Sequence, residues 1–262
     1  MKKYITITTL FLAGTASLCA ATYTWTGSAG DRLWGNSSNW DLNNGYYPQS
    51  DSDIAVVGEN MGTITWTTEQ PYFGASNAIT LGKGSEISCQ FPNNSTGDFK
   101  FNTLNLYGVF SAEGTNALGF GRDFTVNFGD ITETSSGLMD LSGFTGMLWG
   151  NSHTVTLTAS AKVKGIGEIE LLKFGASVYG GSVFVDTDGI AVSDADGNAL
   201  TLNSDATSVS DLSEGEYALL TSTSGNGGVS ILYSAPIPEP SAFGLLAGVG
   251  ALALVVARRR RK

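Results

Sequence analysis

The chain has 262 residues, of which 34 are glycine and only 15% are charged. A coiled coil or helical bundle needs long runs of charged, helix-favouring residues, so this composition excludes both and favours strands and turns. Between the two basic ends, 7 basic residues accompany 24 acidic ones, a net charge of −17 that excludes nucleic acid and anionic lipid headgroups as partners of this surface.

Residues 1–21 have the three-part pattern of a secretory signal peptide. Two lysines near the start precede an apolar and hydroxyl-bearing run from Ile5 to Leu18, and small residues at positions 19–21 supply a cleavage site. The alternative is an N-terminal strand of a cytosolic domain. Cleavage would leave Cys89 as the only thiol, so we expect a domain without an internal disulfide.

Residues 22–237 form the passenger, which we treat as one domain because its composition is even. Its opening stretch, from Tyr23 to Trp40, is rich in aromatic residues. This stretch resembles the Trp-rich start of autotransporter-like surface proteins, which implies a β-helical passenger. We expect the rings of Trp25, Trp34 and Trp40 to cap the first turn of a stacked β core. The alternative is that they form a platform for stacking sugar rings.

Strand patterns recur throughout the passenger. The clearest is Val155–Val163, where apolar and polar side chains alternate with a period of two. Strand centres near Thr80, Leu104 and Val126 recur at intervals of about 22–24 residues, close to one coil of a parallel β-helix, whereas the strand near Leu157 departs from this spacing. We therefore predict an all-β fold with a solenoid-like, parallel β-helix core. A β-sandwich is the alternative.

The C-terminal part of the passenger, from Ser182 onward, has shorter strand patterns. The segments Asp186–Gly189 and Asp194–Gly197 have the composition of hairpin turns, so we predict a hairpin-rich antiparallel meander here. The carboxylates could also bind Ca²⁺, although turn formation is the better explanation for them. No other cofactor is expected. The candidate Ca²⁺ ligands are Asp186, Asp188, Asp194 and Asp196.

Catalytic residues are scarce in this sequence. His153 is the only histidine, and the sequence contains no G-x-S-x-G nucleophile motif. One histidine without a cysteine pair also excludes the common zinc sites, so we expect His153 to be a surface residue. The 24 acidic residues leave open a pair of carboxylates in a glycoside hydrolase or polysaccharide lyase, but the sequence singles out no pair.

Residues 238–262 form a second terminal signal, in which a short proline-containing motif precedes the apolar segment Ser241–Ala257 and a basic tail. The seventeen residues of this segment would make about 26 Å of helix, close to a hydrocarbon core of about 30 Å. We predict a single transmembrane helix with the basic tail in the cytoplasm. The motif is Pro238, Glu239 and Pro240, and the tail is Arg258, Arg259, Arg260, Arg261 and Lys262.

This arrangement of motif, apolar segment and arginine tail resembles the PEP-CTERM sorting signal of Gram-negative envelope and biofilm proteins. The resemblance implies export to the cell envelope, surface or matrix, and processing by a membrane enzyme called exosortase. It implies no activity for the passenger.

These patterns together predict an exported envelope protein, anchored at least transiently by its C-terminal helix, that contacts matrix polysaccharide or other surface proteins without catalysis. The alternative is a carbohydrate-active enzyme on a β-helix scaffold. A groove in which carboxylates converge beside exposed aromatic rings would favour the enzyme, whereas acidic residues scattered over turns would favour the non-catalytic protein.

Overall fold

The computed structural model describes residues 20–67, 77–91, 96–115, 117–149, 152–175, 178–179, 184–222 and 227–237. Nearly all of the signal peptide and the whole tail 238–262 therefore lie outside the described residues. Within them, the regular structure consists of strands and two 3₁₀ turns, η1 (Ser37–Asn39) and η2 (Val209–Asp211). The prediction of an all-β fold is confirmed.

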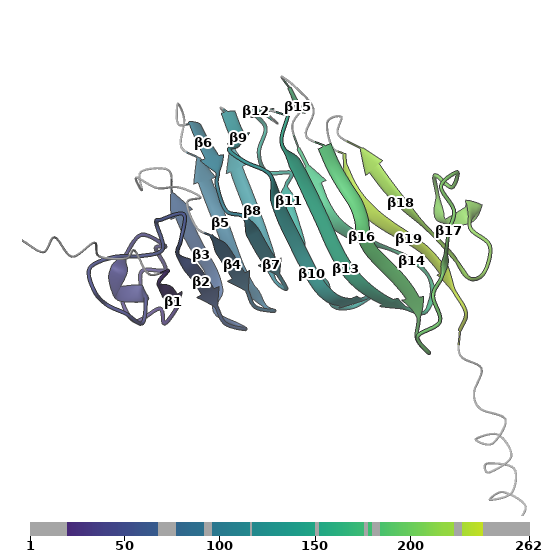
Figure 1. The fold of residues 1–262 in the computed structure, drawn as a ribbon, viewed down its shortest axis with the longest axis horizontal. Coiled ribbons are helices and arrows are strands. Elements are labelled where there is room, and N and C mark those ends of the chain that lie inside the picture. Colours follow the sequence, from purple (N-terminus) through teal and green to yellow (C-terminus); the bar gives the residue numbers. More distant parts are fainter. Residues whose placement is uncertain are drawn as a thin grey trace, which may run out of the picture.

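The strands form three sheets, which run side by side along the molecule (Figure 1). Sheet 1 has the order β1 (Thr22–Thr24), β2 (Ile54–Val57), β4 (Ala78–Leu81), β7 (Thr103–Leu106), β10 (Phe124–Thr132), β13 (Thr154–Val163) and β16 (Phe184–Asp194). Sheet 2 has the order β3 (Gly62–Thr67), β5 (Ser85–Phe91), β8 (Val109–Gly114), β11 (Leu138–Leu141), β14 (Gly165–Phe174), β19 (Gly228–Ala235), β18 (Glu216–Ser222) and β17 (Thr201–Leu202). Sheet 3 has the order β6 (Thr96–Phe99), β9 (Ala117–Phe120), β12 (Met147–Trp149) and β15 (Val178–Tyr179).

From β4 to β16, the chain passes from sheet 1 to sheet 2 to sheet 3 and then returns to sheet 1, one strand further along. We call each such passage a circuit. Every pair of named strands between residues 78 and 164 is parallel. Among the described strands, antiparallel pairing is limited to β19 with its neighbours β14 and β18, so the antiparallel core of a β-sandwich is not what forms here.

The register of sheet 1 gives the length of each circuit. Successive partners across the sheet are Ile54, Ala78, Thr103, Thr125, Thr156 and Asp186. The circuits have about 22–25 residues as far as β10 and about 30 residues from there on, within the range of solenoid repeats. The strand spacing read from the sequence is thus the spacing of adjacent strands in one sheet. The strand near Leu157 joins the same sheet as β13, because the later circuits lengthen.

The core is built from stacked rows of inward-facing side chains. One row in sheet 2 aligns Ile64, Ile87, Phe110, Met139 and Leu172 across five parallel strands, and all five side chains are buried. Alternation along each strand directs every second residue to this interior. Burial of an aliphatic or aromatic side chain contributes about 1.5–3 kcal/mol, so such rows hold the circuits together without a disulfide.

The corner between sheets 1 and 2 depends on glycine. A Cβ atom built on Gly82 would lie 2.6 Å from the carbonyl carbon of Gly58 and 2.7 Å from the amide nitrogen of Glu59. A Cβ on Gly108, one circuit later, would lie 2.6 Å from the carbonyl oxygen of Gly82. The backbones of successive circuits therefore pack directly against one another at this corner, which accounts for part of the high glycine content.

Polar side chains form a hydrogen-bonded ladder on the outer face of sheet 1. Asn105 Nδ2 donates to Thr80 Oγ1, Asn127 Nδ2 donates to Asn105 Oδ1, and both distances are 3.2 Å. The hydroxyl of Thr158 donates to Asn127 Oδ1 at 3.2 Å. The ladder therefore links four circuits on the solvent side of the sheet.

The C-terminal part is only partly the predicted antiparallel meander, because β16 pairs in parallel with β13 and β17 in parallel with β18, whereas β18 and β19 are antiparallel. It also lacks one of the two predicted hairpin turns. Asp186–Gly189 lies inside β16, where Thr156 pairs with Asp186 and Thr158 with Gly189, so β16 contains one extra residue. The prediction of a hairpin turn there is wrong. This segment is a β-bulge, in which Asp186 Oδ1 accepts a hydrogen bond of 3.0 Å from the amide of Asp188.

Asp194–Gly197 does form a turn, as predicted. The amide of Gly197 donates to the carbonyl of Asp194 at 3.1 Å, and Ser193 and Ala199 form an antiparallel bridge across the turn. The antiparallel strands β18 and β19 then close the end of sheet 2 against β14.

Within the part of the chain that the structure describes, no helix has the length and apolar character to cross a membrane. The predicted transmembrane helix, Ser241–Ala257, lies outside that part.

Candidate functional site

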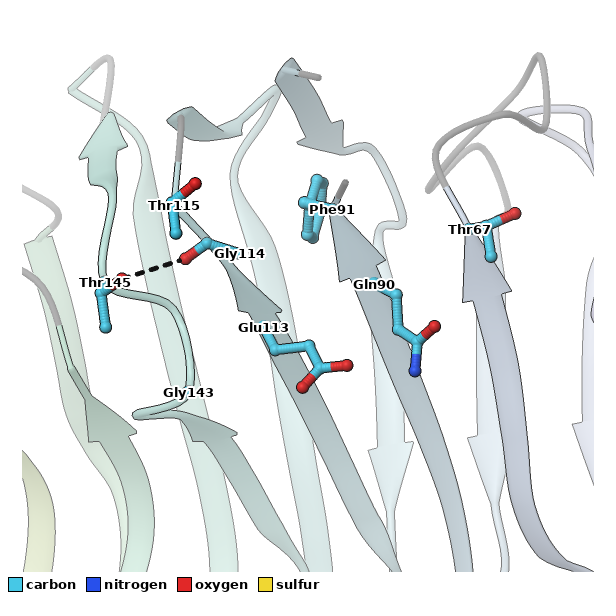
Figure 2. Close-up of a pocket in the computed structure, with 8 residues that line it drawn as sticks. All are labelled: Thr67, Gln90, Phe91, Glu113, Gly114, Thr115, Gly143 and Thr145. Atoms are coloured by element: carbon cyan, nitrogen blue, oxygen red, sulfur yellow. Dashed lines mark hydrogen bonds between the residues drawn. The ribbon is translucent and has the colours of Figure 1, made fainter. Parts of the chain in front are cut away.

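A groove lies on the outer face of sheet 2, near the ends of β3, β5 and β8 (Figure 2). Its volume is about 520 Å³. We call it the sheet 2 groove. The residues that line it are Thr67, Gln90, Phe91, Glu113, Gly114, Thr115, Gly143 and Thr145.

The polar side of the groove is a row of three side chains. In the parallel register Thr67 pairs with Gln90, and Gln90 pairs with Glu113. Adjacent strands lie about 4.8 Å apart, so the row extends about 10 Å across the sheet. Side chains alternate between the two faces of a sheet, and all three of these face outward, so they lie on the same surface.

The far wall of the groove is the turn after β11. The amide of Thr145 donates to the carbonyl of Gly114 at 2.8 Å, and its hydroxyl donates to the same oxygen at 3.4 Å (Figure 2). A Cβ on Gly114 would lie 2.7 Å from Phe91 Cβ and 3.1 Å from the ring of Phe144. Glycine at position 114 therefore allows the turn to approach β8 closely enough to form this wall.

The groove offers hydrogen-bonding groups with free capacity. Among the described residues, no protein group bonds the side-chain amide of Gln90 or the carboxylate of Glu113. The amide both donates and accepts, the carboxylate accepts, and the hydroxyls of Thr67 and Thr145 add further donors and acceptors. This set matches a ligand rich in hydroxyl groups. Glu113 is the only carboxylate among the lining residues that the structure describes.

Two other hollows each contain two carboxylates. One, of about 550 Å³, includes Glu168 and Glu170 on β14, and Lys173 Nζ lies 2.6 Å from Glu170 Oε2. The other, of about 170 Å³, lies at the corner between sheets 1 and 2 and includes Glu59 and Asp130. An exposed tyrosine, Tyr107, also lines this smaller hollow.

Many of the remaining carboxylates stabilise turns. The pKa of Asp211 is lowered because its carboxylate accepts hydrogen bonds from the Ser208 hydroxyl and from the amides of Thr207 and Ser208. The pKa of Asp194 is lowered by hydrogen bonds from Asn198. Every described carboxyl group whose pKa is shifted is shifted downward, because hydrogen bonds stabilise the charged form. These groups are Asp31, Asp123, Asp194, Asp211 and Glu216.

His153 lies half-buried just before β13. Its Nδ1 is 3.2 Å from Asp123 Oδ1, and the same carboxylate oxygen accepts a 2.7 Å hydrogen bond from the amide of Thr154. The backbone bond and the histidine lower the pKa of Asp123. Asp123 and His153 thus fix the start of β13, away from the sheet 2 groove.

The predicted aromatic residues belong to the interior. Trp25, Trp34 and Trp40 are 3%, 0% and 1% exposed, and Trp34 stacks on Trp66 with ring centroids 4.4 Å apart. The indole nitrogen of Trp40 donates to the carbonyl of Trp34 at 2.8 Å. A sugar-stacking platform needs exposed ring faces, so these residues do not form one. They cover the first circuit.

The four predicted Ca²⁺ ligands do not converge. Asp194 accepts hydrogen bonds from the amides of Asp196 and Asn198 at 2.9 and 2.8 Å, while Asp186 bonds the amide of Asp188 within the bulge. Within the described ranges, no group of three or more His, Cys, Asp or Glu side chains is placed to hold a metal ion. The structure gives Asp186 and Asp194 roles in shaping the backbone.

Comparison with protein families finds one match. Residues 236–261 match the family described as the PEP-CTERM protein-sorting motif. The chain carries a PEP-CTERM sorting motif. The motif residues Pro238, Glu239 and Pro240 and the four arginines of the tail all lie within the match, and they lie outside the described residues.

The sorting motif identifies an exported protein that is sorted by a C-terminal signal and processed by exosortase. Its destination is the cell envelope or surface. Comparison with curated proteins found no match, and comparison with solved structures found none. The resemblance of the passenger to autotransporter-like proteins therefore stays a prediction.

The residues of the sheet 2 groove were not identified from the sequence, although a signal was present. Gln90 follows Thr67 at the same interval along the chain as Glu113 follows Gln90. Polar residues repeated at the length of one circuit are the signal for this row, and the same repeat relates the centres of the strands.

Proposed function

We propose that the protein is an exported, non-catalytic parallel β-helix that binds matrix polysaccharide at the cell envelope through the sheet 2 groove. The C-terminal segment 241–257 anchors it in the membrane at least until exosortase acts. Parallel register over successive circuits supports the β-helix assignment. The sorting motif supports the location.

The observation that carries the binding proposal is the row formed by Thr67, Gln90 and Glu113. Its hydroxyl, amide and carboxylate groups combine donors with acceptors, as the hydroxyls of a sugar chain do. The backbone of the row is fixed by three hydrogen-bonded strands, so ligand binding needs to order only the side chains. A groove of about 520 Å³ lies within the usual range of about 300–1,000 Å³ for ligand sites.

Three features favour binding over hydrolysis. A glycoside hydrolase uses two carboxylates about 5–10 Å apart, and the described residues that line the sheet 2 groove include one. The carboxylates of Asp194 and Asp211 lie outside the groove lining and accept hydrogen bonds that stabilise turns. In the larger two-carboxylate hollow Glu170 is held in an ion pair, and the smaller hollow, at about 170 Å³, is below the usual size of a ligand site.

Binding can be tested with the full-length chain in detergent micelles and a panel of soluble polysaccharides that includes pectin, mucin and bacterial exopolysaccharide. We expect a Glu113→Gln, Gln90→Ala double variant to bind at least about tenfold more weakly, since a hydrogen bond to a charged group contributes about 1.5–3 kcal/mol. Glu168→Gln, on the same sheet but outside the groove, is the matched control.

Two results would contradict the proposal. Unchanged affinity of the double variant would place binding elsewhere on the molecule. Release of new reducing ends or unsaturated sugars by the wild-type chain would establish the enzyme alternative. Loss of that activity in Glu168→Gln or in Asp130→Asn would then identify which of the two hollows with two carboxylates is responsible.

A further inference from the structure

Two isoleucines are exposed where the passenger ends. Ile166 and Ile237 are 71% and 75% exposed, more than any other large apolar side chain among the described residues. Ile166 pairs with Ser234 on β19, and a Cβ on Gly165 would lie 3.9 Å from Ile237 Cγ1. Ile237 therefore lies beside Gly165, the residue before Ile166, so both isoleucines lie at the same end of the β14–β19 pair and both are open to solvent.

The chain reaches this position immediately before the sorting signal. β19 ends at Ala235, and Ile237 is followed by the motif 238–240 and by the apolar segment that starts at Ser241. In Figure 1, β19 leads the chain out at the end of the molecule that also holds β14. The exposed pair is thus located at the point where the passenger joins its anchor.

The short connection limits how far this end can move from the bilayer. Three residues separate Ile237 from Ser241, where the apolar segment starts, and four extended steps of at most about 3.6 Å span about 14 Å in total. The headgroup layer on one side of the hydrocarbon core is about 5–8 Å thick. When the apolar segment is inserted, Ile237 must lie within or close to that layer.

Basic and acidic side chains are mixed near the pair, where Glu216 also lies opposite Ser234 in the register of β18 and β19. Lys162 and Lys164 precede Ile166 and are exposed, and they are two of only 7 basic residues between the chain's basic ends. Lys164 Nζ lies 3.8 Å from Glu133, and Glu168 is also exposed nearby. A basic residue near an anionic membrane contributes about 1 kcal/mol, whereas the strongly acidic remainder is repelled.

We propose that Ile166, Ile237 and Lys164 form a membrane-contact patch that holds the C-terminal end of the passenger against the headgroup layer while the tail is inserted. This inference rests on the proposed membrane anchoring. The isoleucines enter the interface and the lysine pairs with lipid phosphate. The patch thereby fixes the orientation of the passenger relative to the membrane, which a flexible connection alone would leave free.

The test uses the full-length chain reconstituted into vesicles of phosphatidylethanolamine and phosphatidylglycerol. A polarity-sensitive fluorophore is attached at Glu168→Cys, beside the patch, and at Thr63→Cys, in the first circuit, as the matched control. Flotation of the vesicles reports insertion of the tail. We expect a blue shift and protection from an aqueous quencher at position 168 and neither at position 63.

The double variant Ile166→Asn, Ile237→Asn should still float but lose the blue shift, with the ratio of docked to undocked passenger falling about tenfold or more. Absence of flotation in the wild-type chain would refute the anchoring itself. Flotation with a water-like signal at position 168, or an unchanged signal in the double variant, would overturn the patch alone. A blue shift that grows with the protein-to-lipid ratio would indicate contact with a second copy, which also overturns it.

Discussion

Replacement of Gly82 by alanine tests whether direct backbone packing at the corner of sheets 1 and 2 holds the circuits in register. The new Cβ would lie 2.6–2.7 Å from three backbone atoms of Gly58 and Glu59, so the backbone of one circuit must move away from the next. Overpacking of this kind costs about 1–3 kcal/mol, and the reduced entropy of the unfolded chain offsets about 0.4–1 kcal/mol. We expect a net loss of about 1–2 kcal/mol.

Thermal unfolding of the full-length chain, followed by circular dichroism, measures this loss. For a domain of about 150–250 residues, 1 kcal/mol lowers Tm by about 2–4 °C, so Gly82→Ala should unfold about 2–8 °C below wild type. The matched control is Gly58→Ala at the same corner, where the new Cβ meets only the flexible end of Met61, at 3.2 Å. Equal Tm values for the two variants would refute the reasoning.

Three further predictions concern the core, the outer ladder and the turns. Trp34→Ala should lower the free energy of unfolding in denaturant by about 3–5 kcal/mol, because it removes a fully buried indole. Tyr46→Ala, at an exposed site, should change it little. Equal losses in the two variants would contradict the role of the tryptophans in covering the first circuit. Asn127→Ala should lower the free energy of unfolding by about 1–3 kcal/mol, since it removes hydrogen bonds to two neighbouring circuits. A Tm equal to that of the wild type would show that the ladder does not contribute to stability. Because the pKa of Asp211 is lowered in the folded state, its contribution is present above the unfolded pKa of about 4 and is lost as the pH falls through the folded pKa. Asp211→Asn should therefore lower Tm at pH 7 and flatten the dependence of Tm on pH below about 4, and an unchanged pH profile would argue against this role.

The strands of the passenger could be predicted from the sequence because their apolar residues alternate on a parallel sheet that has a solvated outer face. The spacing of Thr80, Leu104 and Val126 reflects the repeat of one circuit. The strand near Leu157 departed from that spacing because the circuit that ends at β13 is longer than those before it. No local feature of a strand specifies the length of the segments that follow it, so this change could not be predicted.

The turn at Asp194 and the bulge at Asp186 show where local composition is ambiguous. Both segments have Asp at the first and third positions and Gly at the fourth. An aspartate that bonds an amide two residues later stabilises a turn and a bulge equally well. The difference comes from β13, which pairs with β16 on both sides of Asp188 and keeps the chain extended. The sheet 2 groove was missed for a related reason, since its polar row exists only between circuits.

Because the circuits lengthen along the chain, the two ends of the stack of circuits differ in structure. A stack of identical circuits can be extended indefinitely by further copies, as in fibrils, because each circuit can pack on any other. Here the later circuits are longer than the earlier ones. At the end with the longer circuits, sheet 2 is closed by antiparallel strands, whereas tryptophans cover the end with the shorter circuits. Among the described residues, the two ends therefore differ in circuit length and in what covers them, which disfavours head-to-tail stacking of copies.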